Sequence, residues 1–216
     1  MPNWTSTTLE VTGNAQDILR FKSIAAQPTK EGSVALSFNG FIPMPDSLHV
    51  TEGGHSELAE QVFFGSGFEQ NRRPWMDKED IFCAEALSLY LDVVDPDAHK
   101  EGRIRHENRK NHGHPSWYGW SCANWGTKWD ACHASLDDED ETRLLYSFDT
   151  AWSPAEPVLF AMSEQFPELA FTATFKEESG EFYYQAEWKD GEKLGETQLE
   201  DDACEDEDED IWGDDE

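Results

Sequence analysis

The apolar residues change their spacing twice along the chain, from every second position to a helical period, and this restricts the fold more than any other feature. Residues 6–13 alternate as a strand does, with Leu9 and Val11 on one face. Asn14 can then cap a helix with Asp17 in its first turn. The apolar stripe of this helix comprises Ile18, Phe21 and Ile24 or Ala25.

The second change of period lies in the last third of the chain. Residues 129–150 predict a hairpin with the acidic run "DDEDE" at its tip. In the helix that follows, Ser153 is expected as the cap, Pro154 at the first position and Glu156 as the partner in a capping box. Pro167 ends this helix. Residues 169–178 alternate as a strand, and residues 180–193 predict a further strand and turn.

Between these regions, "VALSFNGFIPMP" (34–45) predicts a second extended segment. An insertion of about residues 44–116 follows, and it is expected to be mainly helical or irregular. Within it, residues 46–76 look irregular, a helix is predicted from Asp77 to just before Pro96, and residues 99–115 are the only basic stretch, expected as a solvated loop.

Without the insertion, the expected order is strand, helix, strand, strand, helix, strand. This order is typical of an α+β fold of the ferredoxin-like (split βαβ) type, an antiparallel sheet with both helices on one face. We expect a single domain over residues 1–195, interrupted by the insertion, and an acidic, disordered tail over residues 196–216. The fold name implies no iron–sulfur cluster, because the four cysteines lack cluster spacing.

The net charge of −30 limits the partners of the protein. Residues 199–216 hold twelve Asp or Glu and no Lys or Arg, and the rest of the chain is also acidic. Such a surface repels nucleic acid and anionic lipid and attracts basic surfaces. Solubility alone, or adaptation to high salt, would also account for a charge of this sign.

The sequence predicts a cytoplasmic protein of a bacterial host cell. It has no signal peptide and no apolar run long enough for a transmembrane helix. The scattered cysteines fit reduced thiols. The thirteen Phe, nine Trp and five Tyr offset a low hydrophobic fraction of 38 %, because each buried ring removes a large area from water.

The segment "WYGWSCANWGTKWDAC" (117–132) holds four tryptophans. Gly119 and Gly126 argue against one continuous helix through it. We expect the rings to pack between the sheet and the insertion, with indole N–H groups donating to backbone carbonyls. An aromatic platform for bases or a peptide is the alternative, but only Lys128 supplies positive charge within the segment.

Four blocks carry a resemblance to a known family: "MPNW…LEVTG", "SFNGFIPMP", "WYGWSCANWGTKWDA" and "YSFDTAWSPAEPVLFAMSEQFPEL". In this order they resemble the YubB-type family of ferredoxin-like proteins of bacteriophages and conjugative plasmids, over about residues 1–45 and 115–190. The resemblance implies the fold and a mobile-element setting. It implies no reaction and no catalytic residues.

Motifs for catalysis, metals and cofactors are weak. "FFGSGF" is a lone GxG, and the chain has no GxSxG, HExxH or SxxK. His112, His114 and Cys122 could hold zinc, and Cys122 could pair with Cys132, but neither spacing is specific. In the tail, Asp206, Asp208 and Asp210 lack the glycine and glutamate of a calcium loop. We therefore expect no enzyme activity, no metal and no cofactor.

Our leading hypothesis is a non-enzymatic phage- or plasmid-encoded protein that binds and inhibits a host defence protein through acidic mimicry of nucleic acid. The expected partner has a basic nucleic-acid-binding surface, and neither membrane nor direct nucleic-acid binding is expected. The sequence leaves the oligomeric state open. The residues expected to bind the partner are Asp137, Asp138, Glu139, Asp140 and Glu141 in the hairpin, and Glu205, Asp206, Glu207, Asp208, Glu209, Asp210 and Trp212 in the tail.

Two alternatives stay open. One is a nucleic-acid-binding module that uses the basic residues 100–114, with the neighbouring tryptophans. Its expected contacts are Arg103, Arg105, Arg109 and Lys110. The other is a metal-dependent enzyme built on His112, His114 and Cys122.

Overall fold

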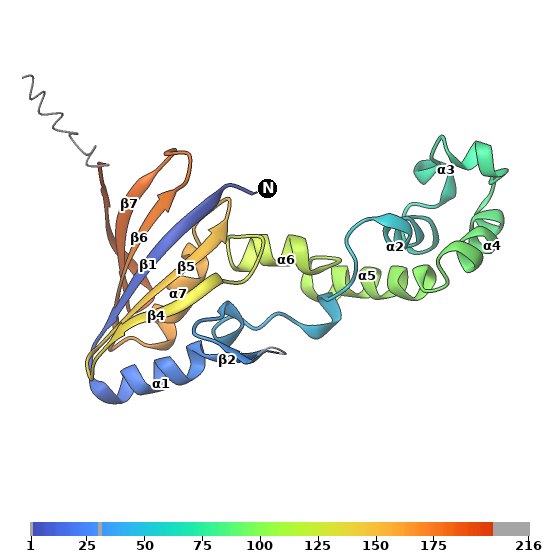
Figure 1. Ribbon diagram of the computed structural model, residues 1–216. Helices are drawn as coiled ribbons and strands as arrows, with labels where there is room; N and C mark the ends of the chain where they lie inside the picture. Colours follow the sequence, from blue (N-terminus) through green and yellow to red (C-terminus); the bar gives the residue numbers. More distant parts are fainter. Residues whose placement is uncertain (1, 30–31, 201–216) are drawn as a thin grey trace, which may run out of the picture.

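The computed structural model describes residues 2–29 and 32–200. Two parts are visible in Figure 1: a sheet body, formed by the described residues up to 45 and by residues 113–200, and a helical arm, residues 46–112, that projects from it. Among the described residues, no helix is both long enough and apolar enough to cross a membrane.

The sheet body contains one six-stranded antiparallel sheet, in the order β4-β5-β1-β6-β7-β8. Two helices, α1 (Ala15–Ala25) and α7 (Glu156–Gln165), belong to it, and a short hairpin of β2 (Gln27–Thr29) and β3 (Gly32–Val34) follows α1. The strands are β1 (Trp4–Thr12), β4 (Cys132–Glu139), β5 (Arg143–Ala151), β6 (Ala170–Glu177), β7 (Tyr183–Lys189) and β8 (Glu192–Gln198).

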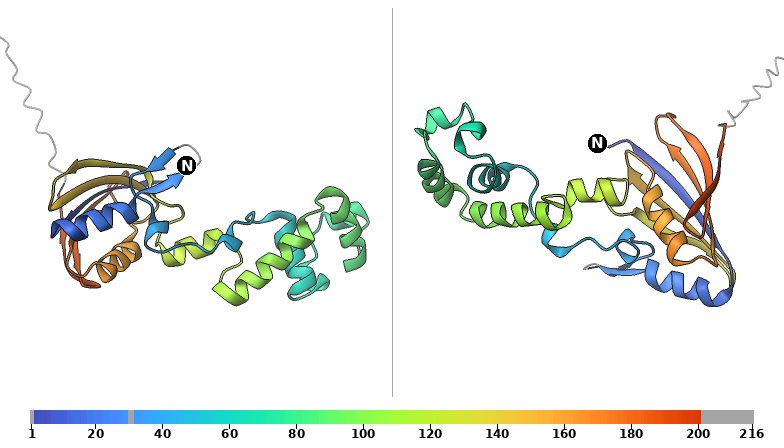
Figure 2. Two further views of the ribbon diagram at one scale, coloured as in Figure 1. Left: turned by 90° about the horizontal axis from the view of Figure 1, so that it is seen from below. Right: turned by 180° about the vertical axis from the view of Figure 1, so that it is seen from behind.

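Alternating burial gives the sheet one covered and one open face. Leu9 and Val11 of β1 are fully buried, as predicted, and Tyr146 of β5 lies opposite Leu9. The covered face packs against α1 and α7, which lie on the same side of the sheet (Figure 2, right). Asn14 caps α1 by accepting a 3.0 Å hydrogen bond from the Asp17 N–H, also as predicted.

The ferredoxin-like fold is confirmed, with β1-α1-β4-β5-α7-β6 as its six elements. The prediction that residues 34–45 form a sheet strand is wrong, and the β4–β5 hairpin supplies both middle strands. Residues 38–40 form a 3-10 turn instead, because the Asp130 carboxylate accepts hydrogen bonds from the Phe38 N–H (2.6 Å) and the Ser37 hydroxyl (2.5 Å). The apolar residues of this segment cover the edge of the core as a loop.

The predicted capping box at Ser153 is also wrong. The Ser153 hydroxyl donates to the Gly126 carbonyl at 2.6 Å, so it is engaged away from the helix end. Helix α7 begins at Glu156, whose carboxylate accepts from the Tyr184 hydroxyl at 2.7 Å and from Lys193 at 3.0 Å. The buried residues of this segment are Val158, Leu159, Met162 and Phe166.

The helical arm is more regular than the sequence indicates. Residues 46–76, expected to be irregular, contain α2 (Gly54–Ala59), a π-helical turn (Glu60–Phe64) and α3 (Phe68–Asn71). Short 3-10 turns cover Asp46–Leu48 and Met76–Glu79. These pieces are short, and Gly65 and Gly67 separate the π-helical turn from α3, so no helical period is visible in the sequence.

Three longer helices complete the arm and its junction: α4 (Ala84–Val94), α5 (Ala98–His112) and α6 (Trp117–Asn124). Helix α4 starts at Ala84 and not at Asp77, because Asp80 adopts a left-handed conformation (φ 54°) that ends the preceding turn. The arm has its own apolar cluster, separate from that of the sheet body. Its buried members include Leu58, Met76, Ile81, Leu87 and Leu91.

Candidate protein-binding surface

The open face of the sheet carries a row of carboxylates on its β4 side, which we call the acidic stripe: Glu10, Asp137 and Asp149. Asp149 lies opposite Ser6, Asp137 bonds to Ser147 opposite Thr8, and Glu10 lies opposite Leu145. Successive members are therefore two residues (~6.8 Å) apart along the strand direction, and they lie on three different strands that are ~4.8 Å apart across the sheet.

Hydroxyl groups, rather than cations, fix the central carboxylate of the stripe. Asp137 accepts from the Ser135 hydroxyl at 2.6 Å and also from the Ser147 hydroxyl. At the hairpin turn, Asp140 accepts from the Thr142 N–H at 2.7 Å and from its hydroxyl at 3.0 Å. These hydrogen bonds favour the ionised form and hold the pKa of both carboxyls below the ordinary value.

Two of the five predicted hairpin residues are paired with cations. Asp138 accepts from Arg143 at 2.8 Å, and Arg143 also pairs with Glu10. Glu139 pairs with Lys22 of α1. In the described part of the chain, Asp137, Asp140 and Glu141 are exposed and form no ion pair with Lys or Arg, so they present most of the uncompensated charge of the hairpin.

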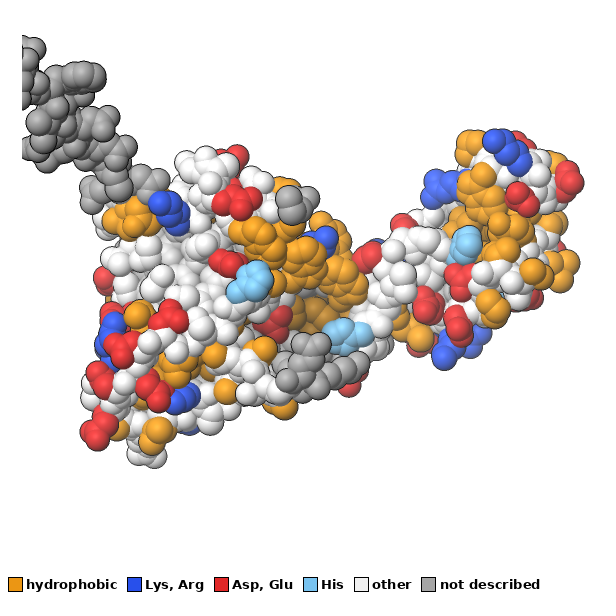
Figure 3. Space-filling model, viewed as in Figure 1, with side chains coloured by type: hydrophobic (Ala, Val, Ile, Leu, Met, Phe, Trp, Pro, Cys, Tyr) orange, Lys and Arg blue, Asp and Glu red, His pale blue; other side chains and the backbone are white. Residues whose placement is uncertain are grey.

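An aromatic cluster lies at the other end of β4. The Trp4 ring centroid is 6.0 Å from that of Trp129 and 5.8 Å from that of His133. The His133 Nδ1 lies 2.9 Å from an Asp149 oxygen, and the Lys128 Nζ lies 4.6 Å from the Trp129 ring centroid. Figure 3 shows a hydrophobic patch here, beside a histidine on the open face. Sequence reasoning missed this cluster, because Trp4 and Trp129 meet only through the sheet.

The remaining predicted partner-binding residues are the tail residues Glu205, Asp206, Glu207, Asp208, Glu209, Asp210 and Trp212. They lie outside the described residues, as does most of the segment 196–216. Residues 192–198 form β8, an edge strand that the sequence did not predict. Its side chains are mostly exposed and polar, so they leave no alternating pattern.

The packing role of the tryptophan-rich segment is confirmed. Trp120 and Trp125 are buried in the core of the sheet body, with ring centroids 5.5 Å apart. The Trp125 indole N–H donates to the Ile42 carbonyl at 3.0 Å, as expected for a buried indole. The segment forms α6 up to Asn124 and then turns at Gly126, which has φ 79°.

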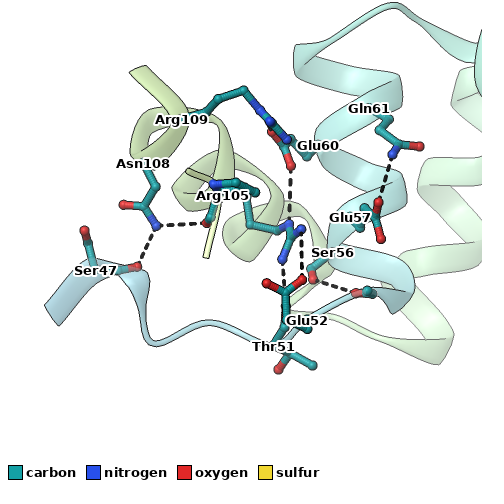
Figure 4. A network of polar contacts seen from close by, with 12 residues as sticks. Ser47, Thr51, Glu52, Ser56, Glu57, Glu60, Gln61, Arg105, Asn108 and Arg109 are labelled. Carbon is teal, nitrogen blue, oxygen red and sulfur yellow. Dashed lines mark hydrogen bonds and ion pairs between the residues drawn. The ribbon is translucent and has the colours of Figure 1, made fainter. Parts of the chain in front are cut away.

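The basic stretch is not a solvated loop but the helix α5, and Arg105 is its buried anchor. The side chain of Arg105 is 2 % exposed. Its guanidinium donates to the Thr51 carbonyl (2.8 Å) and to Glu60 (3.3 Å), as Figure 4 shows. Arg109 donates to the other Glu60 oxygen at 2.9 Å. Gly102 permits this contact, because a Cβ there would lie 2.9 Å from the Glu60 nitrogen.

These contacts reduce the number of cations that the nucleic-acid-binding alternative can use. Arg105 is buried and Arg109 is paired, so two of its four expected contacts serve the arm itself. Lys100, Arg103 and Lys110 are exposed on α5.

The residues of the metal alternative lie near one another in sequence but do not form a ligand set. His112 Nε2 lies 3.4 Å from the Ser47 hydroxyl, and Cys122 is exposed. Within residues 2–29 and 32–200, no three His, Cys, Asp or Glu side chains are placed to hold a metal ion. Cys83, Cys122 and Cys132 are free thiols, and burial and the nearby Asp130 and Asp149 raise the pKa of Cys132.

The fold and this surface define a ferredoxin-like protein with an inserted helical arm. Residues 125–213 match a family model described as the ferredoxin-like domain in Api92-like protein. The crystal structure of a protein Api92 from Yersinia pseudotuberculosis is also similar: it has 11% sequence identity and a TM-score of 0.46, and the match covers 93% of this chain and 99% of that one. No curated protein matches the chain. The ferredoxin-like part of the expected resemblance is confirmed, whereas the YubB-type family and the mobile-element setting stay predictions.

Proposed function

We propose that this protein is a non-enzymatic binding protein whose open sheet face docks on a basic, nucleic-acid-binding surface of another protein. The observation that carries the proposal is the acidic stripe together with the hairpin tip. The stripe carboxylates lie at successive two-residue levels of the sheet. The carboxylates of Asp137 and Asp140 accept hydrogen bonds from hydroxyls and form no ion pair with Lys or Arg in the described part of the chain.

The aromatic cluster supplies the second half of the surface. Trp4, Trp129 and His133 adjoin Asp149 at one end of the stripe. Protein interfaces concentrate binding energy in aromatic anchors, while surrounding charges give orientation and a fast encounter. A partner with a basic groove can therefore meet carboxylates along β4 and place an apolar side chain on the rings.

In this function the carboxylates occupy the sites that phosphates otherwise fill, so binding excludes nucleic acid. The lowered pKa values of Asp137 and Asp140 keep both groups ionised as the pH falls toward the ordinary carboxyl range. The setting that we propose is the cytoplasm of a bacterium, with a phage- or plasmid-encoded inhibitor and a host defence protein as its target. The net charge of −30 and the resemblance noted in the sequence support this setting.

The first test is a pull-down from bacterial lysate with three forms of the full chain. The variant that we call the stripe variant changes the central stripe carboxylate and the two hairpin-tip carboxylates without an ion pair to Lys or Arg among the described residues: Asp137→Asn, Asp140→Asn and Glu141→Gln. The matched control carries Glu164→Gln, Glu168→Gln and Glu178→Gln, which removes three exposed carboxylates elsewhere. We expect the wild type and the control to retain a basic protein at low salt and to release it at high salt, because exposed charges are screened.

The stripe variant should bind this protein about tenfold more weakly, which corresponds to ~1.4 kcal/mol. Equal retention by all three forms would refute the role of the stripe. Recovery of nucleic acid alone, lost on nuclease treatment, would favour the nucleic-acid-binding alternative instead.

A further inference from the structure

A pocket on the helical arm collects positive charge that the fold does not use. It has a volume of about 610 Å³ and lies between the π-helical turn, α4 and α5. Its lining consists of Phe64, Ser88, His99, Lys100, Arg103 and Ile104.

The cations of this pocket are available to a ligand. Lys100 and Arg103 are exposed, and neither forms an ion pair in the described part of the chain, although acids outnumber bases almost threefold in the whole sequence. The Arg103 guanidinium lies 5.8 Å from the Phe64 ring centroid. His99 accepts or donates a 3.0 Å hydrogen bond with Ser88 and lies 3.9 Å from an Asp92 oxygen. The site therefore combines an apolar wall with two unpaired cations.

We propose that this pocket binds the acidic segment 205–212 of a second copy of the same chain. Six successive acidic residues, 205–210, precede Ile211 and Trp212. An extended run of six residues spans ~20 Å, and the fifteen residues of α5 rise by ~22 Å, so the acids can follow the cations of the helix. Ile211 and Trp212 then pack on Phe64 and Ile104. Arg105 and Arg109 are engaged by Glu60, so the cations that α5 offers are Lys100, Arg103 and Lys110, beside Glu101 and Glu107 of the same helix.

The reach of the chain favours a second copy over the same one. Residues 201–211 span at most ~38 Å when extended. The path to the pocket crosses the sheet from β8 (~24 Å for six strands), then α6 (~12 Å) and more than half of α5 (~12 Å). Figure 1 and Figure 2 show β8 and the arm on opposite sides of the molecule. The contact is therefore head-to-tail, and it is separate from the acidic stripe.

Charge exchange between two variants tests the contact in the full chain. The pocket variant carries Lys100→Glu and Arg103→Glu, and the tail variant carries Glu205→Lys, Glu207→Lys and Glu209→Lys. A control carries Lys78→Glu and Lys189→Glu, two exposed lysines outside the pocket. Circular dichroism verifies that all forms are folded, and sedimentation velocity at low and high salt measures self-association.

We expect the wild type, the control and the stripe variant to self-associate at low salt, and the pocket and tail variants each to associate at least about tenfold more weakly. An equimolar mixture of the pocket and tail variants should associate again, because each supplies the half that the other lacks. A monomeric wild type, a pocket variant that associates normally, or a mixture that stays monomeric would each overturn the proposal. In the last two cases, the acidic segment binds elsewhere or another acidic ligand fills the pocket.

Discussion

Glu60 and Arg105 form the most consequential pair of residues in the helical arm. Their side chains are 5 % and 2 % exposed, and Arg109 shares the same carboxylate. A buried ion pair adds little stability when both partners are present, because desolvation offsets the attraction. Removal of one partner is costly, because the other charge stays buried without compensation.

Glu60→Ala should therefore lower the free energy of unfolding of the arm by about 3 kcal/mol. The double variant Glu60→Leu/Arg105→Met should lose less than Glu60→Ala, since it leaves no buried charge. Arg103→Ala, at an exposed position, should change stability by less than about 0.5 kcal/mol. Urea unfolding, combined with hydrogen exchange of the α5 amides, measures these differences. An unchanged free energy of unfolding in Glu60→Ala would show that the pair is not a structural anchor.

Among the elements, the close packing of the tryptophan-rich segment against the start of α7 depends on one glycine. Gly126 has φ 79°, and a Cβ there would lie 2.8 Å from the Pro157 side chain and 3.2 Å from the Pro154 carbonyl oxygen. Gly180, in the β6–β7 turn, has a similar φ of 82° but nothing within 4 Å of the same position. A comparison of substitutions at these two glycines therefore distinguishes the effect of backbone strain from the effect of a steric clash.

We expect Gly126→Ala to lower stability by about 2–3 kcal/mol and Gly180→Ala by only about 1 kcal/mol, because the second pays backbone strain alone. Thermal unfolding of both variants and the wild type gives the comparison. Equal losses in the two variants would show that the prolines move aside and that the close approach at Gly126 is not a constraint.

At the same scale, local patterns predicted the elements with a clean period. The alternation around Leu9 and the stripe around Phe21 predicted β1 and α1 because their burial depends on neighbours in sequence. The strand prediction for residues 34–45 failed because Asp130, far along the chain, accepts a hydrogen bond from the backbone N–H of Phe38. The prediction that Arg105 lies in a solvated loop failed for the same reason, since its partner Glu60 is 45 residues away in the sequence. Within the candidate surface, the acidic hairpin was predictable, whereas the hydroxyls at Asp137 and the ring contacts of Trp4 depend on strand register.

In the whole molecule, acidic residues are in excess in both the sheet body and the arm, and α5 is a local basic element within the arm. Residues 113–200 hold 18 Asp or Glu and only 5 Lys or Arg, whereas α5 in the arm is basic. Local concentrations of charge of this kind orient an approaching partner, and they raise the rate of encounter most at low salt. The acidic sheet body and the basic pocket can therefore serve different contacts without competing for one surface.

The central claim is that the open sheet face replaces nucleic acid on its partner, and a competition experiment with the captured protein tests it most directly. The partner is first bound to a fluorescent duplex, and the protein is then added while anisotropy is followed. The account predicts that wild type and the Glu164/Glu168/Glu178 control release the duplex at the same concentration, and that the Asp137/Asp140/Glu141 variant needs about tenfold more. A complex in which partner, duplex and protein stay bound together, or equal release by all three forms, would contradict it.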